Sequence, residues 1–161
     1  MVVIRYGPVL PALLGVYHTK CKHPADGEDL DAEDLDQFKK YREEIGDNIA
    51  TIALMMQDKC QERLLQALAA SCTGAGKSWQ GAESALLLMQ SSSETLNTSE
   101  LNQTPKLFTE CLSRLPQHPL VVKRALLAIG AHSEWLANES HFTSGLGRSG
   151  QPVVPSAVKV E

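Results

Sequence analysis

Apolar residues recur every three or four positions along most of the chain, the spacing of one buried face of an α-helix. The longest such seam predicts a helix over residues 35–57. Its inward positions are Phe38, Tyr41, Ile45, Ile49, Ile52 and Met56. A shorter seam after Pro8 predicts a first helix that ends near residues 18–20, with inward positions Leu10, Leu13, Leu14 and Tyr17. No segment alternates strictly between apolar and polar residues, so the pattern indicates an all-α protein.

Caps and breakers divide the middle of the chain into two further helices. Asp58 is a plausible cap for a helix that ends at the glycine-rich segment 73–76. Its inward residues are Leu64, Leu65, Leu68 and Cys72. Ser78 can cap the next helix, over 79–94. Its inward residues are Ala82, Ala85, Leu86 and Met89.

Two last helices are predicted on either side of a turn with two prolines, residues 116–119. The fifth begins at Pro105, with inward residues Leu107, Phe108, Cys111, Leu112 and Leu115. The sixth covers 119–138 and carries two adjacent apolar stripes. One stripe has Val122, Leu126, Ile129 and Leu136, and the other has Val121, Ala125, Ala128, His132 and Trp135. So wide an apolar arc predicts that this helix packs against two neighbours.

Six helices in three hairpins give repeats of about forty residues, within the range of HEAT units. We therefore predict an α-solenoid of antiparallel helix pairs, HEAT- or armadillo-like, with about three repeats. Residues 1–142 form this helical repeat segment, with an acidic linker at 21–34 inside it. Residues 143–161 are rich in glycine, serine and proline, and we expect a disordered tail. A generic helical bundle shares part of the pattern and is the alternative.

Composition excludes several classes of function. The net charge of −4 argues against a nucleic-acid binder, which would carry a basic stripe. No apolar run reaches the roughly 18 residues of a membrane span, and no basic region precedes an apolar one at the start. The four cysteines contain no Cys-x-x-Cys pair and are expected to be reduced core thiols. We expect an intracellular, soluble protein without a membrane partner.

Seven carboxylates lie within the eleven residues from Asp26 to Asp36. Such a run is often only a solvated loop, but it would also attract a basic partner through long-range electrostatics. The candidate partner-binding residues are Asp29, Asp31, Glu33, Asp34 and Asp36.

Signals for chemistry are weak. Residues 71–78 resemble the end of a phosphate-binding loop, with Ser71 where the first glycine belongs, but the preceding segment is predicted to be helical instead of a strand. His18, Cys21 and His23 lie close in sequence without a clear fourth metal ligand. His132 lies on an apolar helix face with no nucleophile placed near it by a motif. We therefore expect no catalytic residue, metal or cofactor.

Three segments in collinear order resemble the middle repeats of the importin-β nuclear transport receptors, in the branch of importin-13 and transportin-3. They are Phe38-x-x-Tyr41-Arg42-x-x-Ile45, Ser78-Trp79-Gln80-x-x-Glu83-x-Ala85-Leu86-Leu87 and Ile129-Gly130-Ala131-x-Ser133-Glu134-Trp135-Leu136-Ala137. The resemblance covers about Pro8 to Asn138. It implies a superhelix of HEAT repeats whose second helices line a concave, cargo-binding face; here these are 35–57, 79–94 and 119–138.

The resemblance also implies a non-enzymatic function. Receptors of this family shuttle between cytoplasm and nucleus, bind protein cargo, exchange it under control of the GTPase Ran in its GTP form, and contact phenylalanine-glycine repeats of the nuclear pore. The chain is far shorter than a whole receptor, so we expect Ran and pore binding of a full-length receptor only. We also expect exposed helical faces at the two ends and a tendency to self-associate. An unrelated HEAT or armadillo scaffold is the alternative.

Overall fold

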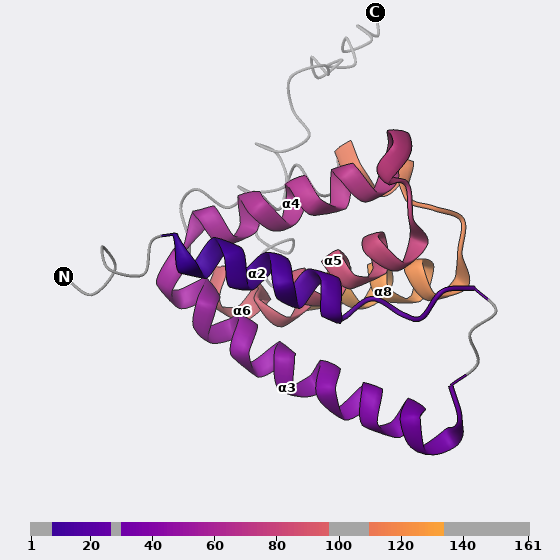
Figure 1. Cartoon of the computed structure of the whole chain (residues 1–161). Coiled ribbons are helices and arrows are strands. Elements are labelled where there is room, and N and C mark those ends of the chain that lie inside the picture. Colours follow the sequence, from indigo (N-terminus) through magenta and orange to yellow (C-terminus); the bar gives the residue numbers. More distant parts are fainter. Residues whose placement is uncertain (1–7, 27–29, 97–109, 134–161) are drawn as a thin grey trace, which may run out of the picture.

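Helices form the regular structure of the computed structural model, which describes residues 8–26, 30–96 and 110–133 (Figure 1). The elements are α2 (Val9–Lys20), α3 (Ala32–Met56), α4 (Asp58–Cys72), the 3-10 turn η1 (Gly74–Gly76), α5 (Trp79–Ser91), α6 (Ser93–Leu96), the 3-10 turn η3 (Leu112–Arg114) and α8 (Pro119–Ala131). No strand occurs within these ranges, and the predicted all-α class is confirmed for them.

Helices α3 and α4 meet at Gln57 and diverge from there, with α2 between them (Figure 1). Gln57 has a φ of 51°, which reverses the chain within one residue. At its other end, α3 begins at Ala32, earlier than the predicted residue 35, because the Asp31 side chain caps it. The end of the predicted linker 21–34 is therefore helical.

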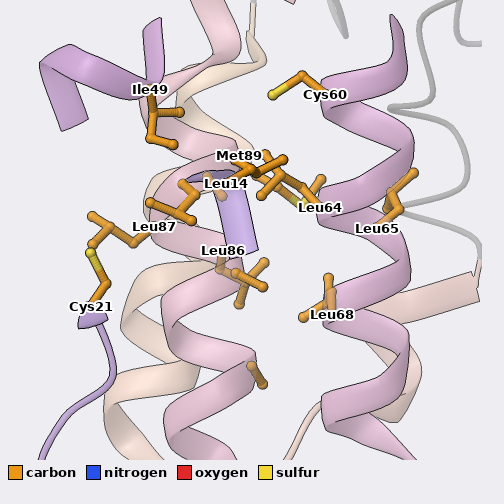
Figure 2. Close-up of a cluster of buried hydrophobic side chains, with 14 of the residues drawn as sticks. Leu14, Cys21, Ile49, Cys60, Leu64, Leu65, Leu68, Leu86, Leu87 and Met89 are labelled. Carbon is orange, nitrogen blue, oxygen red and sulfur yellow. The ribbon is translucent and has the colours of Figure 1, made fainter. Parts of the chain in front are cut away.

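Helix α5 forms the centre of the molecule and contacts α2, α3, α4 and α8. Every residue from Gly81 to Met89 is buried, because neighbours cover all sides of this helix. Its side chains join Leu14 of α2, Ile49 of α3 and Leu64 of α4 in one apolar core (Figure 2). Burial of each such leucine or isoleucine contributes about 1.5–3 kcal/mol to stability. The inward residues predicted for α5 are confirmed.

The contacts of α3 and α5 occur in the same order along both helices. Arg42 of α3 contacts Glu83 of α5, and further along, a Cβ atom at Gly46 would lie 3.0 Å from the Ser91 hydroxyl oxygen. The two helices therefore run in the same direction.

Helix α8 follows the same direction along α5. His118, its N-cap, stacks on Trp79 at the start of α5, and Arg124 further along contacts Glu83 and Gln90. Helices α2 and α4 run the opposite way, from left to right in Figure 1, whereas α3 and α5 run from right to left. Alternate helices are thus antiparallel, and α3, α5 and α8 are parallel.

One predicted inward position on α3 and the predicted cap of α4 differ in the structure. Tyr41 is 40% exposed, and the adjacent Arg42 is buried in its place at 6%. Asp58 is the first residue of α4, and the N-cap is Gln57, whose side chain makes no capping hydrogen bond. The inward residues predicted for α4 are buried as expected: Leu64, Leu65, Leu68 and Cys72.

For the predicted fifth and sixth helices, the structure confirms only some of the predicted features. In the predicted fifth helix, residues 105–109 lie outside the described ranges, and Leu112–Arg114 form a 3-10 turn. On α8 the stripe of Val121, Ala125, Ala128 and His132 is buried. The other stripe was wrongly predicted to be inward, because Val122 is 48% and Leu126 65% exposed. The expected positions after residue 133, including Trp135 and the tail 143–161, lie outside the described ranges.

Candidate protein-binding groove

Glu83 lies at the centre of a buried charged cluster and is only 2% exposed. Arg42 Nη2 of α3 donates to both of its carboxylate oxygens, at 2.6 and 2.7 Å. Arg124 Nε of α8 donates to Oε1 at 3.0 Å, and His23 Nε2 lies 3.7 Å from Oε2. One carboxylate on the central helix therefore joins both parallel neighbours and the segment after α2.

The two guanidinium groups have further acceptors. Arg42 Nη1 donates to the Cys21 carbonyl oxygen at 2.8 Å, and Arg124 Nη1 donates to Gln90 Oε1 at 2.9 Å. Among the described residues, Glu83 is the one carboxylate that pairs with either arginine. The arginines and Glu83 together carry a formal charge of +1. Desolvation of these buried charges offsets much of their Coulomb attraction. The stability of the cluster therefore depends on the good geometry of its hydrogen bonds.

The C-terminal end of α2 is fixed to α5 by two hydrogen bonds of His18. Its Nε2 donates to the Gly81 carbonyl oxygen at 2.9 Å, and its own carbonyl accepts from the Ser84 hydroxyl at 2.8 Å. Burial lowers the pKa of His18 and keeps the ring neutral near pH 7. Gly81 packs closely against α4, because a Cβ there would lie 2.6 Å from the Ser71 hydroxyl oxygen and would force this side chain to move.

Four rings form a column beside the charged cluster. His23 contacts Phe38 with ring centroids 5.4 Å apart and Trp79 at 5.6 Å. Trp79 stacks on His118 at 3.8 Å, with planes 9° apart, and its Nε1 donates to the Asp26 carboxylate at 3.0 Å. Burial, with a smaller effect of the Arg42 charge, lowers the pKa of His23. The column orders the starts of α5 and α8 against the loop before α3.

A groove of about 900 Å³ lies along the parallel helices above this cluster. Its wall on α3 carries Leu35, Lys39, Arg42, Glu43, Gly46 and Asp47. The opposite wall carries Glu83 and Gln90 of α5, Glu94 of α6, and Lys123 and Arg124 of α8. A groove with charges of both signs suits a polar segment of a partner protein better than an apolar small molecule.

The predicted acidic binding residues lie at the exposed N-terminal end of α3. Asp31 caps the helix, accepting from the Glu33 and Asp34 backbone N–H groups at 2.9 and 2.8 Å. Asp36 pairs with Lys40 at 2.7 Å. Asp29 lies outside the described residues. The structure therefore brings four of the predicted acids, Asp31, Glu33, Asp34 and Asp36, onto one exposed helix start, apart from the buried cluster.

The phosphate-loop interpretation of residues 71–78 is contradicted. Helix α4 runs to Cys72 and Thr73 is its C-cap, so no strand enters the loop. The Ser78 hydroxyl oxygen accepts from the Gly81 backbone N–H at 3.2 Å and serves as the N-cap of α5, as predicted. This segment is a helix-to-helix turn.

The possible metal ligands have separate partners. His18 bonds Gly81, Cys21 is fully buried in the apolar core, and His23 faces Glu83. Within the described ranges, no group of three or more histidine, cysteine or acidic side chains is arranged to hold a metal ion. In the same ranges, no helix combines the length and hydropathy that crossing a bilayer requires.

Sequence reasoning missed the roles of Arg42, Glu83 and Arg124. The signal was present, because Arg42 interrupts a helical apolar seam and Glu83 lies within an otherwise apolar helix. A charged residue on a buried face needs a partner of opposite charge. The local apolar pattern does not identify the partner of a buried charge, because the residues that pair are 41 positions apart in the sequence.

No protein-family model matches the chain. Transportin MOS14 of Arabidopsis thaliana is 27% identical over 135 residues, which cover 81% of this chain. The matched region spans 14% of the length of that transportin. The similarity supports the resemblance carried by the sequence segments around Phe38, Ser78 and Ile129. The chain is a distant homologue of this transportin, a receptor of the importin-β family.

Proposed function

We propose that this chain is a HEAT-type repeat segment of an importin-β-type receptor, and that it binds protein cargo for transport into the nucleus. The observation that carries the proposal is the common direction of α3, α5 and α8 with α2 and α4 running opposite. Stacked helical hairpins produce this arrangement, because each repeat adds one outer and one inner helix. The distant similarity to a transportin supports the same conclusion.

In this proposal α3, α5 and α8 are the inner helices, and residues 1–142 form the repeat segment. The groove lies along these inner helices, where a solenoid presents its concave face. The exposed apolar stripe of α8, at Val122, Leu126 and Leu127, is the face that the next repeat of a longer receptor would cover. The chain spans 14% of the transportin, so Ran-GTP and nuclear-pore repeats are proposed as partners of a full-length receptor only.

The cargo-binding surface includes the acidic start of α3, with Asp29, Asp31, Glu33, Asp34 and Asp36. In the described part of this set the carboxylates are exposed. They therefore keep their hydration while attracting a basic protein surface over a Debye length of about 8 Å at physiological salt. No covalent chemistry is needed for this function, since transport relies on binding linked to conformational change.

A pull-down from cell extract tests the proposal, with the full chain immobilised at low and at physiological salt. We expect specific basic proteins to be retained at physiological salt. Neutralising Glu33, Asp34 and Asp36 as the triple variant E33Q/D34N/D36N should reduce their capture. The matched control neutralises Glu44, Glu62 and Glu110, three exposed acids outside this surface.

Adding Ran loaded with GTP separates a transport segment from a general scaffold. Release of captured protein by Ran-GTP would indicate that this part of the receptor responds to Ran by itself. Retention of the same cargo with and without Ran in a full-length receptor containing this segment would contradict a transport function. Recovery of only salt-sensitive, unspecific proteins would contradict cargo binding.

A further inference from the structure

Helix α8 presents a nearly uncharged surface on the side opposite its buried stripe. Val122, Leu126 and Leu127 are 48%, 65% and 43% exposed there. Among the described positions of α8, Lys123 is the one exposed charged residue, and the helix contains no acid. A shallow hollow of about 690 Å³ lies along this stripe. The solvent-facing side of a helix normally carries polar and charged residues, so this composition indicates a face that another helix covers.

Gly130 leaves a gap in the exposed surface of α8. The residue is exposed, and no atom lies within 4 Å of a Cβ built there. Val122 and Gly130 are each four residues from Leu126, so all three lie on the same face of the helix. Four residues rise about 6 Å along a helix. A branched side chain and a gap therefore lie at equal distances from Leu126, in opposite directions.

This spacing is self-complementary under two-fold symmetry. In an antiparallel pair of α8 helices that cross at Leu126, Val122 of each copy enters the gap at Gly130 of the other. The two Leu126 side chains meet at the axis. A parallel pair would instead place like residues opposite one another, including the two Lys123 charges. The antiparallel pair separates the two Lys123 positions by about 9 Å of helix rise, because each lies three residues from the axis.

From these features we infer that the 161-residue chain forms a two-fold symmetric dimer through α8, with Leu126 at the axis. The molecule that covers the exposed face of α8 is a second copy of this chain. Antiparallel helix dipoles add a small attraction. The inference does not depend on the proposed cargo binding. Since a second copy on this face excludes a further repeat, the dimer and a longer solenoid are alternative uses of one surface.

Cysteine cross-linking of the full chain tests the position of the axis. Facing helices pack about 8–10 Å apart, which brings Cα atoms at the axis within disulfide range. Leu126→Cys should therefore form a disulfide between two copies when it is oxidised with copper phenanthroline in air. Lys123→Cys, at an exposed position of the same helix, is the matched control and should cross-link at least about tenfold more slowly.

The natural chain gives the background of this experiment, because its described cysteines are buried: Cys21, Cys60, Cys72 and Cys111. The disulfide is covalent and captures even a dimer that the loss of Leu126 has weakened. Equal cross-linking rates for the two variants, or no cross-link through position 126, would overturn the inference.

Sedimentation equilibrium tests the packing at the gap. Gly130→Leu adds apolar surface to α8, so unspecific apolar association would increase. The inferred packing requires the opposite, because a leucine at this position fills the space that Val122 enters. We expect the Kd of the dimer to rise about tenfold or more, at unchanged circular dichroism. Stronger association of this variant would overturn the inference.

The same measurement separates a two-fold dimer from head-to-tail assembly through another exposed apolar surface. A two-fold contact closes at two copies, whereas a head-to-tail contact continues to add copies. The mass of the natural chain should therefore level off at that of a dimer. Val16→Gln, at a position of α2 that is 51% exposed, should leave the Kd unchanged. A mass that keeps rising, a weaker dimer in the Val16 variant, or a chain that stays monomeric at millimolar concentration would contradict the inferred dimer.

Discussion

Arg42 and Glu83 form a nearly enclosed ion pair in which one guanidinium nitrogen donates to both carboxylate oxygens, at 2.6 and 2.7 Å. Their side chains are 7% and 2% exposed. The pair joins α3 to the central helix α5, and Arg124 extends it to α8. Together with the apolar core, this contact holds α3 and α5, which form two walls of the groove, next to one another.

Replacing Glu83 with glutamine should lower the free energy of unfolding by about 3–5 kcal/mol, because it leaves two guanidinium groups near a buried site without their carboxylate. Urea denaturation followed by circular dichroism measures the change. The control is Glu62→Gln on the exposed face of α4, which should change stability by about 0.5 kcal/mol or less. A loss at Glu83 no larger than at Glu62 would show that the cluster contributes little to the fold.

Glycine substitutions should separate a packing requirement from a helix-propensity effect. Gly81→Ala should destabilise the protein by about 1–3 kcal/mol, since its Cβ would lie 2.6 Å from the Ser71 hydroxyl oxygen. Gly130→Ala should stabilise it by about 0.5–1 kcal/mol, because no atom lies within 4 Å of the added Cβ in this helix. Thermal unfolding measures both. A shift of Tm in the same direction for the two variants would contradict this reasoning.

Gln57 is the described non-glycine residue with positive φ, at 51°, in the link between α3 and α4. Replacement by glycine should raise the free energy of unfolding by about 1 kcal/mol, since it removes the steric cost of this conformation and adds a smaller entropy cost. Chemical denaturation measures the effect, with Gln66→Gly on the exposed face of α4 as the control. The control variant should lose about 1 kcal/mol of helix propensity. Equal losses in both variants would show that Gln57 is unstrained.

Acid should destabilise the fold through three histidines, because burial lowers the pKa values of His18, His23 and His132 below 6.5. The unfolded chain then binds protons at higher pH than the folded chain. This contribution to stability is present above pH 6.5 and is lost as pH falls toward the folded-state pKa values. We expect a lower Tm at pH 5.5 than at pH 7.5.

His18→Gln provides the matched test, because glutamine can still donate to the Gly81 carbonyl and does not titrate. This variant should show a smaller loss of Tm between pH 7.5 and 5.5 than the natural chain. A Tm that is equal or higher at pH 5.5 in the natural chain would contradict the assignment of neutral, buried histidines.

The exposed stripe of α8 should promote self-association. Val122 is 48%, Leu126 65% and Leu127 43% exposed on one face, and an apolar surface of this kind is rarely left uncovered. Leu126→Gln should shift the protein toward monomer in sedimentation experiments, without loss of Tm. Ser133→Gln, at an exposed position just after α8, is the control. Unchanged association in the Leu126 variant would show that this face does not mediate it.

The positions of the helices could be predicted from the sequence because their signals are local. The apolar spacing of Leu64 and Leu68, the cap at Ser78 and the proline at 119 each act within a few residues. Because these signals are local, they also led to the wrong choice of a buried side chain on α3. Tyr41 and Arg42 are adjacent on α3, and only their neighbours in space decide which side chain is enclosed.

The sequence by itself thus determined the all-helical class of the described residues, the boundaries of α3, α4 and α5 to within about three residues, the turn at 73–78 and the resemblance to a family of transport receptors. Only the tertiary structure decided that Glu83 joins α3, α5 and α8, and that one stripe of α8 is exposed. The reason is physical: helix formation depends on residues three and four apart. The charged cluster depends on Arg42 and Arg124, each 41 positions from Glu83, which meet only after the helices have packed.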